Sequence, residues 1–355
     1  YVIARWGYSR AVGVWVIVDE LDAVGDVVGV MAEKKGWWAH PQCDRWLADV
    51  VRMFHGDLER SDGLAYQGDP FRHPVHAATT SFGGQAEKGS NLEWIGGPPD
   101  ARPDLFGWHW YPSFWSIAHW PDVWAHAIDG VARYAEAPIG AAPRLISEFG
   151  YPDRGTPDDV PSKLYPGLWH FGAWAAVFSG HAGTPMDWDD GKEFGELRWR
   201  EREGIFDREN YPIDHTQRLR ALRRFLGDLS PDALAPCAGD DAPVRCVGEA
   251  DLRVFALCRA RSRDAAWGWL FSPEGQCRFS LDGLAPGAYR LTWYDPWTGD
   301  PIPDLAPQDV TATADAPLAI DASAALEKLS NGAFPAESRL PRGRDAAFKL
   351  LPVGP

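Results

Sequence analysis

Two different patterns of hydrophobic and polar residues follow one another along the chain. Up to about residue 230, short apolar runs of strand length alternate with longer segments in which apolar residues recur at helical spacing. The runs cover residues 12–18, 76–82, 105–111, 143–149 and 183–188, and the helical segments include 41–60, 121–137, 164–180 and 214–230. Strands that alternate with helices predict βαβ units and a parallel sheet, either open or closed into a barrel.

The second pattern begins after residues 231–250, which are rich in Pro, Ala, Asp and Gly and are predicted to form a linker or an edge loop. Short apolar segments separated by turn residues follow at 252–260, 265–272, 276–284, 288–295, 308–315, 316–321 and 345–352. This spacing predicts an all-β sandwich, with residues 327–344 as a surface loop. We therefore expect an α/β domain over residues 1–235 and a β-sandwich domain over residues 236–355.

Composition narrows the function classes. The 355 residues, 45% apolar and 24% charged, are typical of a globular protein with two domains or with one barrel and a small module. The net charge of −15 repels polyanions and argues against a nucleic-acid partner. No apolar run approaches the length of about 20 residues that a membrane-spanning helix needs. The 19 tryptophans suit core packing, and their flat faces also stack on sugar rings.

The five cysteines leave several arrangements open. Cys237 and Cys246 flank a short polar loop and could form a disulfide, and Cys258 and Cys277 lie in two predicted neighbouring strands and could form another. Cys43 would then be left over, and five reduced cysteines fit the sequence equally well. The paired C-x-x-C spacing of a zinc site is absent, and we expect no metal or cofactor.

Polar side chains gather where the predicted parallel strands end. Reactive groups of a parallel β/α fold lie at the carboxyl ends of its strands. The five ends carry, in order, Asp19 and Glu20; Ser81 and Phe82; His109 and Tyr111; Glu148; and Trp188 beside Asp187, Asp189 and Asp190. Any one of these could be a solvated strand end, but five together predict a shared site. The aspartates around Trp188 could also bind Ca²⁺, although a solvated acidic loop is commoner and their spacing matches no known calcium loop.

Two glutamates from different strands are the groups that glycosidic cleavage needs. One carboxyl group stays protonated and gives its proton to the departing oxygen, while the other is ionised and attacks the anomeric carbon. Their surroundings separate the two pKa values, because burial raises the pKa of the acid and hydrogen bonds lower that of the nucleophile. Glu20 and Glu148 are the candidates in this sequence.

Four segments resemble retaining (β/α)8 glycoside hydrolases of the cellulase-like superfamily: "YVIARWGYSRAVGVWVIVDE", "HWYP", "LISEFGYP" and "SGHAGTPMDWDDG". The resemblance covers nearly the whole chain, because "GAYRLTWYDPWTG" and "DAAFKLLP" resemble the β-sandwich that often follows such barrels in extracellular bacterial members. It implies a TIM barrel, of which strands four to eight are visible, followed by a β-sandwich. It also implies an extracellular or cell-surface location and a β-linked poly- or oligosaccharide substrate.

The resemblance also implies roles for individual residues. Glu20 would be the acid/base, and Glu148 would be the nucleophile that forms a covalent intermediate. Tyr111 would hydrogen-bond the nucleophile, His109 would line the sugar site, and Trp188 would form the floor under the reacting sugar.

Two departures from the family pattern qualify this interpretation. Asp19 stands where the family has an asparagine that donates to the sugar, and an ionised carboxylate cannot donate. Strands one to three of the barrel are missing before Tyr1, so we expect an upstream segment or a separate chain to complete it. Two hypotheses follow: an active retaining glycoside hydrolase, or a catalytically inactive relative that binds carbohydrate or assists surface assembly.

Overall fold

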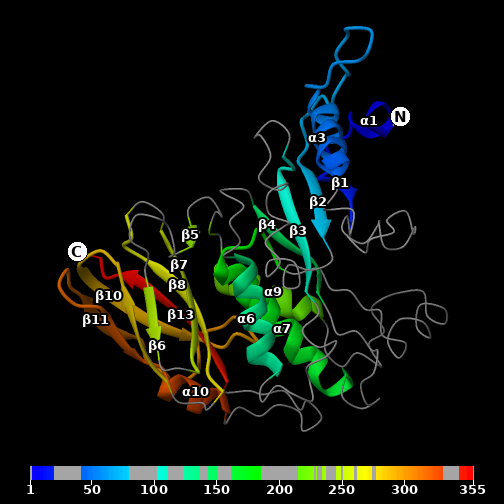
Figure 1. The fold of residues 1–355 in the computed structure, drawn as a ribbon. Helices are drawn as coiled ribbons and strands as arrows, with labels where there is room; N and C mark the ends of the chain where they lie inside the picture. Colours follow the sequence, from blue (N-terminus) through cyan, green and yellow to red (C-terminus); the bar gives the residue numbers. More distant parts are fainter. Residues whose placement is uncertain are drawn as a thin grey trace. The chain divides into compact units, whose positions relative to one another are not determined.

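The structure is a computed structural model, and it falls into two compact units that are described separately below (Figure 1). The first unit comprises residues 1–110, 136–149 and 181–186, and the second comprises 111–135, 150–180 and 187–355. The residues that the structure describes are 2–19, 41–79, 102–110, 123–135, 143–149, 161–184, 215–227, 229, 234–236, 245–248, 251–259, 262–273, 277–330 and 344–354.

A parallel sheet of four strands forms the centre of the first unit (Figure 1). Its strands are β1 (Trp15–Val18), β2 (Val75–Thr79), β3 (Leu105–Trp110) and β4 (Arg144–Phe149). They lie in the order β1-β2-β3-β4, and every neighbouring pair is parallel. The predicted parallel sheet is therefore confirmed over these strands. Of the fifth predicted strand, Gly183 and Thr184 are not in a strand, and residues 185–188 lie outside the described residues.

Two described helices belong to the first unit, α1 (Val2–Trp6) and α3 (Pro41–His55). Helix α3 buries Leu47, Val51 and Phe54, which recur at helical spacing along one face. The helix ends earlier than the predicted residue 60 because Gly56 adopts a φ of 80°, a left-handed conformation that terminates helices.

The second unit combines helices with antiparallel strands. Its main helices are α6 (Val123–Ala135), α7 (Pro161–Ser179) and α9 (His215–Leu226). One sheet has the order β11-β10-β13-β8-β7-β5, with β11 (Gln308–Ala312), β10 (Gly287–Tyr294), β13 (Asp345–Pro352), β8 (Ala266–Phe271), β7 (Arg253–Arg259) and β5 (Leu234–Pro236). The other sheet has the order β12-β9-β6, with β12 (Leu318–Asp321), β9 (Arg278–Asp282) and β6 (Arg245–Gly248).

Side chains from both antiparallel sheets share one hydrophobic core. The ring of Phe348 in β13 lies 5.5 Å from that of Phe279 in β9 and 5.7 Å from that of Trp293 in β10. Gly268 in β8 makes room for this ring, because a Cβ atom there would lie 2.1 Å from Phe348 Cζ. Phe348 thus joins the two sheets within this core, and Gly268 provides the space for its ring.

Helix α7 packs against the larger antiparallel sheet through aromatic rings. Phe171 lies 5.0 Å from Phe271, and Trp174 lies 6.5 Å from Trp269. Residues 169–176 of α7 are all buried, which explains why this helix is apolar on every side. Among the described residues, no helix is both long and apolar enough to cross a bilayer.

Three predictions for the second unit need correction. The predicted linker 231–250 contains the short strands β5 and β6, which add to sheet edges through backbone pairing that composition does not reveal. The predicted loop 327–344 begins inside α10 (Ser323–Ser330), because Leu326 and Leu329 are buried at helical spacing. Cys258 and Cys277 are buried thiols rather than a disulfide.

Candidate functional site

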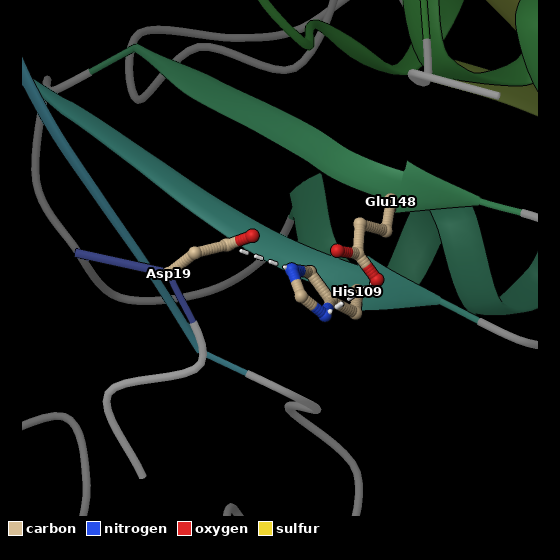
Figure 2. A group of neighbouring side chains, drawn as sticks. All are labelled: Asp19, His109 and Glu148. Atoms are coloured by element: carbon tan, nitrogen blue, oxygen red, sulfur yellow. Dashed lines mark hydrogen bonds and ion pairs between the residues drawn. The ribbon is translucent and has the colours of Figure 1, made fainter. Parts of the chain in front are cut away.

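Three of the predicted site residues meet at the carboxyl ends of the parallel strands (Figure 2). Asp19 directly follows β1, His109 lies in β3, and Glu148 lies in β4. His109 Nε2 is 3.0 Å from Asp19 Oδ1, and His109 Nδ1 is 3.0 Å from Glu148 Oε2. The imidazole ring therefore stands between two carboxyl groups, and we call this group the Asp19–His109–Glu148 cluster.

An irregularity in strand pairing brings Glu148 beside His109. Ile146 of β4 pairs with Trp108 of β3, so regular pairing would place Ser147 opposite His109. The register shifts at this point, and Glu148 becomes the partner of His109 instead. Such bulges redirect a side chain at a strand end, here a carboxylate toward an imidazole.

Asp19 reaches His109 across the intervening strand β2. The register places His76 and Ala78 of β2 on the same face as Gly107 and His109 of β3. Strands β1 and β3 are separated by two strand spacings, or about 10 Å. Ala78 contributes only a methyl group on this face, and the side chains of Asp19 and His109 meet at 3.0 Å.

The cluster becomes more exposed from His109 to Asp19. The side chain of His109 is 0% exposed, that of Glu148 is 12% exposed, and that of Asp19 is 48% exposed. The imidazole is therefore fixed within the protein, while the Asp19 carboxylate faces solvent. A ligand would meet the two carboxylates before it met the ring.

His76 is a neighbour of the cluster that the sequence analysis did not select. Its side chain is buried, and neither ring nitrogen has a hydrogen-bond partner among the described residues. Burial lowers the pKa of His76, the Asp19 carboxylate partly offsets this, and a positive charge on His109 lowers the pKa further. Gly107 accommodates the His76 ring, because a Cβ atom there would lie 2.3 Å from His76 Nε2. The signal in the sequence was a histidine at the start of an otherwise apolar strand.

The cluster consists of residue types that also bind metals. One ligand atom from each of the three residues can be chosen so that all lie within 4.8 Å of one another. However, each ring nitrogen of His109 faces a different carboxylate, and a single ion could take only one of them. The structure thus places one imidazole between two carboxylates, hydrogen-bonded to Asp19 and in a 3.0 Å ion-pair contact with Glu148.

The remaining predicted site residues lie outside the described residues. These are Glu20, Tyr111 and Trp188, together with the aspartates 187, 189 and 190. The convergence of Glu20 with Glu148 therefore stays a prediction. The neighbouring carboxylate, that of Asp19, lies within 4.8 Å of the Glu148 carboxylate.

No family model and no curated protein sequence matches the chain. Among solved structures, the chain is similar to a glycoside hydrolase family 5 protein from Bacteroides vulgatus, with a TM-score of 0.52 and 13% identity over 99% of this chain and 64% of that one. Two others are a glycoside hydrolase (TM-score 0.43, 15% identity, 80% of this chain and 58% of that one) and a GH39 enzyme from Xanthomonas axonopodis pv. citri (0.31, 12%, 80% and 61%).

The first of these similarities shows that the chain has a glycoside hydrolase-like fold. The chain spans less than two thirds of the length of each of the three matched structures.

Proposed function

We propose that the protein is part of a retaining glycoside hydrolase that cleaves a β-linked poly- or oligosaccharide. In this proposal Glu148 is the nucleophile and Glu20 is the acid/base. The observation that carries it is the proximity of the carboxylates of Glu148 and Asp19, within 4.8 Å, at the ends of parallel strands in a glycoside hydrolase-like fold. Asp19 directly precedes Glu20 in the sequence, and its carboxylate lies near that of Glu148, which supports Glu20 as the second acid.

The chemistry follows from two carboxyl groups on one site. Retaining enzymes hold them about 5 Å apart, so that one can attack carbon while the other protonates the leaving oxygen. A Glu148 oxygen forms the bond to the anomeric carbon as the glycosidic bond breaks, and Glu20 gives its proton to the leaving oxygen. Water then displaces Glu148, and Glu20 takes the proton back. The product keeps the configuration of the substrate.

We also propose that the four parallel strands belong to a closed barrel, completed at β1 by an upstream segment or a separate chain. Strand β1 is at the edge of its sheet, and the side chains of Val14 and Val16 are exposed, the latter to 60%. An edge strand with exposed β-branched residues is a template for pairing with another strand. Arginine and other sugar-binding groups would come from the added strands.

For the rest of the chain, we propose a β-sandwich accessory domain over residues 236–355. The common core of the two antiparallel sheets supports this proposal. With a polysaccharide substrate, the protein would work outside the cell or at the cell surface, which is the proposed location.

The second candidate function is carbohydrate binding without turnover. It is favoured by one observation: a Glu148 oxygen is already engaged by His109, and the side chain of Glu148 is only 12% exposed. A nucleophile must donate an oxygen lone pair to the anomeric carbon. An oxygen that is held by His109 is less available for this attack, which would suit a catalytically inactive site.

Hydrolysis of aryl β-glycosides by the complete protein tests the first candidate. We expect turnover with retained configuration, followed by NMR of the first product, and a loss of at least about a thousandfold in Glu148→Gln and in Glu20→Gln. Glu59→Gln is the matched control, because Glu59 is exposed in the same unit and away from the strand ends. No turnover in the unaltered protein, together with glycan binding that survives Glu148→Gln, would leave the binding function.

A further inference from the structure

His109 differs from the other histidines that contact carboxylates in the part of the chain that the structure describes. Those other contacts are His55 with Asp104, His73 with Asp69, and His170 with Asp345, each made through one ring nitrogen. His109 faces a carboxylate at both nitrogens, and the two contacts have the same length of 3.0 Å. This geometry links Asp19 to Glu148 through one ring.

We propose that Asp19 is a positioning residue that acts through His109 to hold Glu148 ionised and correctly oriented. The inference rests on the proposed role of Glu148 as nucleophile. In this arrangement the imidazolium donates a hydrogen bond from Nε2 to Asp19. Its second N–H, at Nδ1, then donates to Glu148 Oε2. In this proposal Asp19 forms no bond to the reacting atoms and acts on Glu148 only through His109.

The hydrogen-bonding capacity of the three groups supports this assignment. An ionised carboxylate only accepts hydrogen bonds, and a neutral imidazole has one donor and one acceptor nitrogen. A neutral ring between two carboxylates would therefore point one lone pair at a carboxylate oxygen, which is repulsive. The imidazolium satisfies both contacts, because both of its nitrogens donate. Three groups then carry a net charge of −1, and Glu148 accepts a charge-assisted hydrogen bond.

Two carboxylates and one further histidine surround His109 among the described residues. The titratable described residues that face it include Asp19, which follows β1, His76 from β2 and Glu148 from β4. Because burial lowers the pKa of His76, that ring is neutral and adds no competing positive charge. An imidazolium at His109 would contact two carboxylates.

Asp19→Asn is the test, because an amide can occupy the same space without the negative charge. The amide N–H of the new side chain would donate to Nε2, and His109 would be neutral with its one proton on Nδ1. Glu148 would lose a cationic neighbour. We expect the acidic limb of the pH profile of kcat/KM to move to higher pH by about one unit.

A second measurement does not depend on turnover. The ¹⁵N NMR signals of the histidine rings, assigned with a His109→Gln variant, report how many ring nitrogens carry a proton. We expect two protonated nitrogens for His109 in the unaltered protein at pH 7 and one in Asp19→Asn. Asp104→Asn is the matched control, since Asp104 contacts His55 at 2.9 Å and is exposed to a similar degree, 42%. It should change neither the pH profile nor the His109 signals.

The outcomes separate this inference from the proposed function. Two protons on His109 in both proteins, or an unchanged acidic limb in Asp19→Asn, would overturn the role of Asp19. Loss of activity with a chelator and recovery with Zn²⁺ or Mg²⁺ would also overturn it, because the cluster would then be a metal site. If no glycoside is cleaved while the NMR signals change as expected, the proposed function fails and the link between Asp19 and His109 stands.

Discussion

Two histidine–carboxylate contacts, one in each unit, have the same chemistry and different surroundings. In the second unit His170 Nε2 lies 2.8 Å from Asp345 Oδ2, and both side chains are 0% exposed. Asp345 also accepts hydrogen bonds from Trp269 Nε1 at 3.0 Å and Trp297 Nε1 at 3.1 Å, and the His170 ring stacks on Trp297. Asp345 is thus buried and accepts hydrogen bonds from three aromatic side chains, a group that we call the Asp345 network.

The Asp19–His109–Glu148 cluster is open where the Asp345 network is closed. Its histidine is equally buried, but Asp19 is half exposed and no tryptophan indole contacts its carboxylate among the described interactions. A carboxylate that accepts hydrogen bonds from three buried donors stabilises the folded state, because each donor loses its partner when the carboxylate is removed. A carboxylate at a strand end keeps an oxygen available for chemistry. What surrounds the acid, rather than the residue pair itself, separates the structural site from the candidate functional site.

The strongest test of this comparison is Asp345→Ala. It leaves the buried donors of His170, Trp269 and Trp297 without their acceptor, so we expect the free energy of unfolding to fall by about 4 kcal/mol. Denaturant titration measures the change. Asp345→Asn keeps one acceptor oxygen and should cost less. A fall below about 1 kcal/mol in the alanine variant would mean that the network does not hold the second unit together.

A smaller loss is expected from Gly107→Ala in the first unit. The new Cβ would lie 2.3 Å from His76 Nε2 and 2.7 Å from Ser147 Oγ, so the His76 ring must move. We expect a loss of about 2 kcal/mol in the free energy of unfolding. Gly13→Ala is the control, because nothing lies within 4 Å of a Cβ there. Equal stability of the two variants would show that the face around Gly107 is not packed as described.

The pH dependence of stability should show the buried His76. Burial lowers its pKa in the folded state below the usual value of about 6.5, so the unfolded chain binds the proton more readily. Its contribution to stability is complete above about pH 6.5 and is lost as the pH falls from there toward the folded-state pKa. Urea titrations at pH 7.5 and 5.5 should show a smaller decrease in His76→Gln than in the unaltered protein. His126 contributes in the same direction and remains in both.

The smallest effect on stability is expected from Asp19→Asn. Because Asp19 is half exposed, its contact with His109 should contribute less than about 1 kcal/mol, unlike that of Asp345. Thermal or denaturant unfolding measures this. A loss as large as that of Asp345→Ala would remove the distinction between the two regions and make Asp19 a structural residue.

Strands such as β3 and β4 could be predicted from the sequence because their apolar runs are short and bounded by turn residues. The identity of the partner of His109 could not, because it depends on the shift in register between Trp108 and His109. Hydrophobic alternation is the same before and after such a shift. Likewise the predicted strand 345–352 includes Asp345, but nothing in the sequence shows that this residue is buried and accepts hydrogen bonds from two tryptophans.

Separations along the sequence explain these limits. Trp269 and Trp297 lie 76 and 48 residues from Asp345, and Asp19 lies 90 residues from His109. The strand-end rule brings Asp19, His109 and Glu148 together without such information, because it concerns backbone direction alone. The strand-end rule does not predict the position of His76, because the His76 ring occupies space that is available only where residue 107 is a glycine.

The turn that follows strand β10 packs closely against helix α9. Gly299 in this turn has a φ of 78°, and a Cβ there would lie 2.1 Å from the carbonyl oxygen of Ala221 in the helix. Arg224 of the helix also forms an ion pair with Asp300 of the turn, at 2.7 Å. A cut between residues 235 and 236 would place helix α9 and this turn on separate fragments. Each fragment would then expose aromatic side chains that are buried in the intact protein. The two pieces should therefore be produced together and recovered as one reassembled particle rather than purified singly.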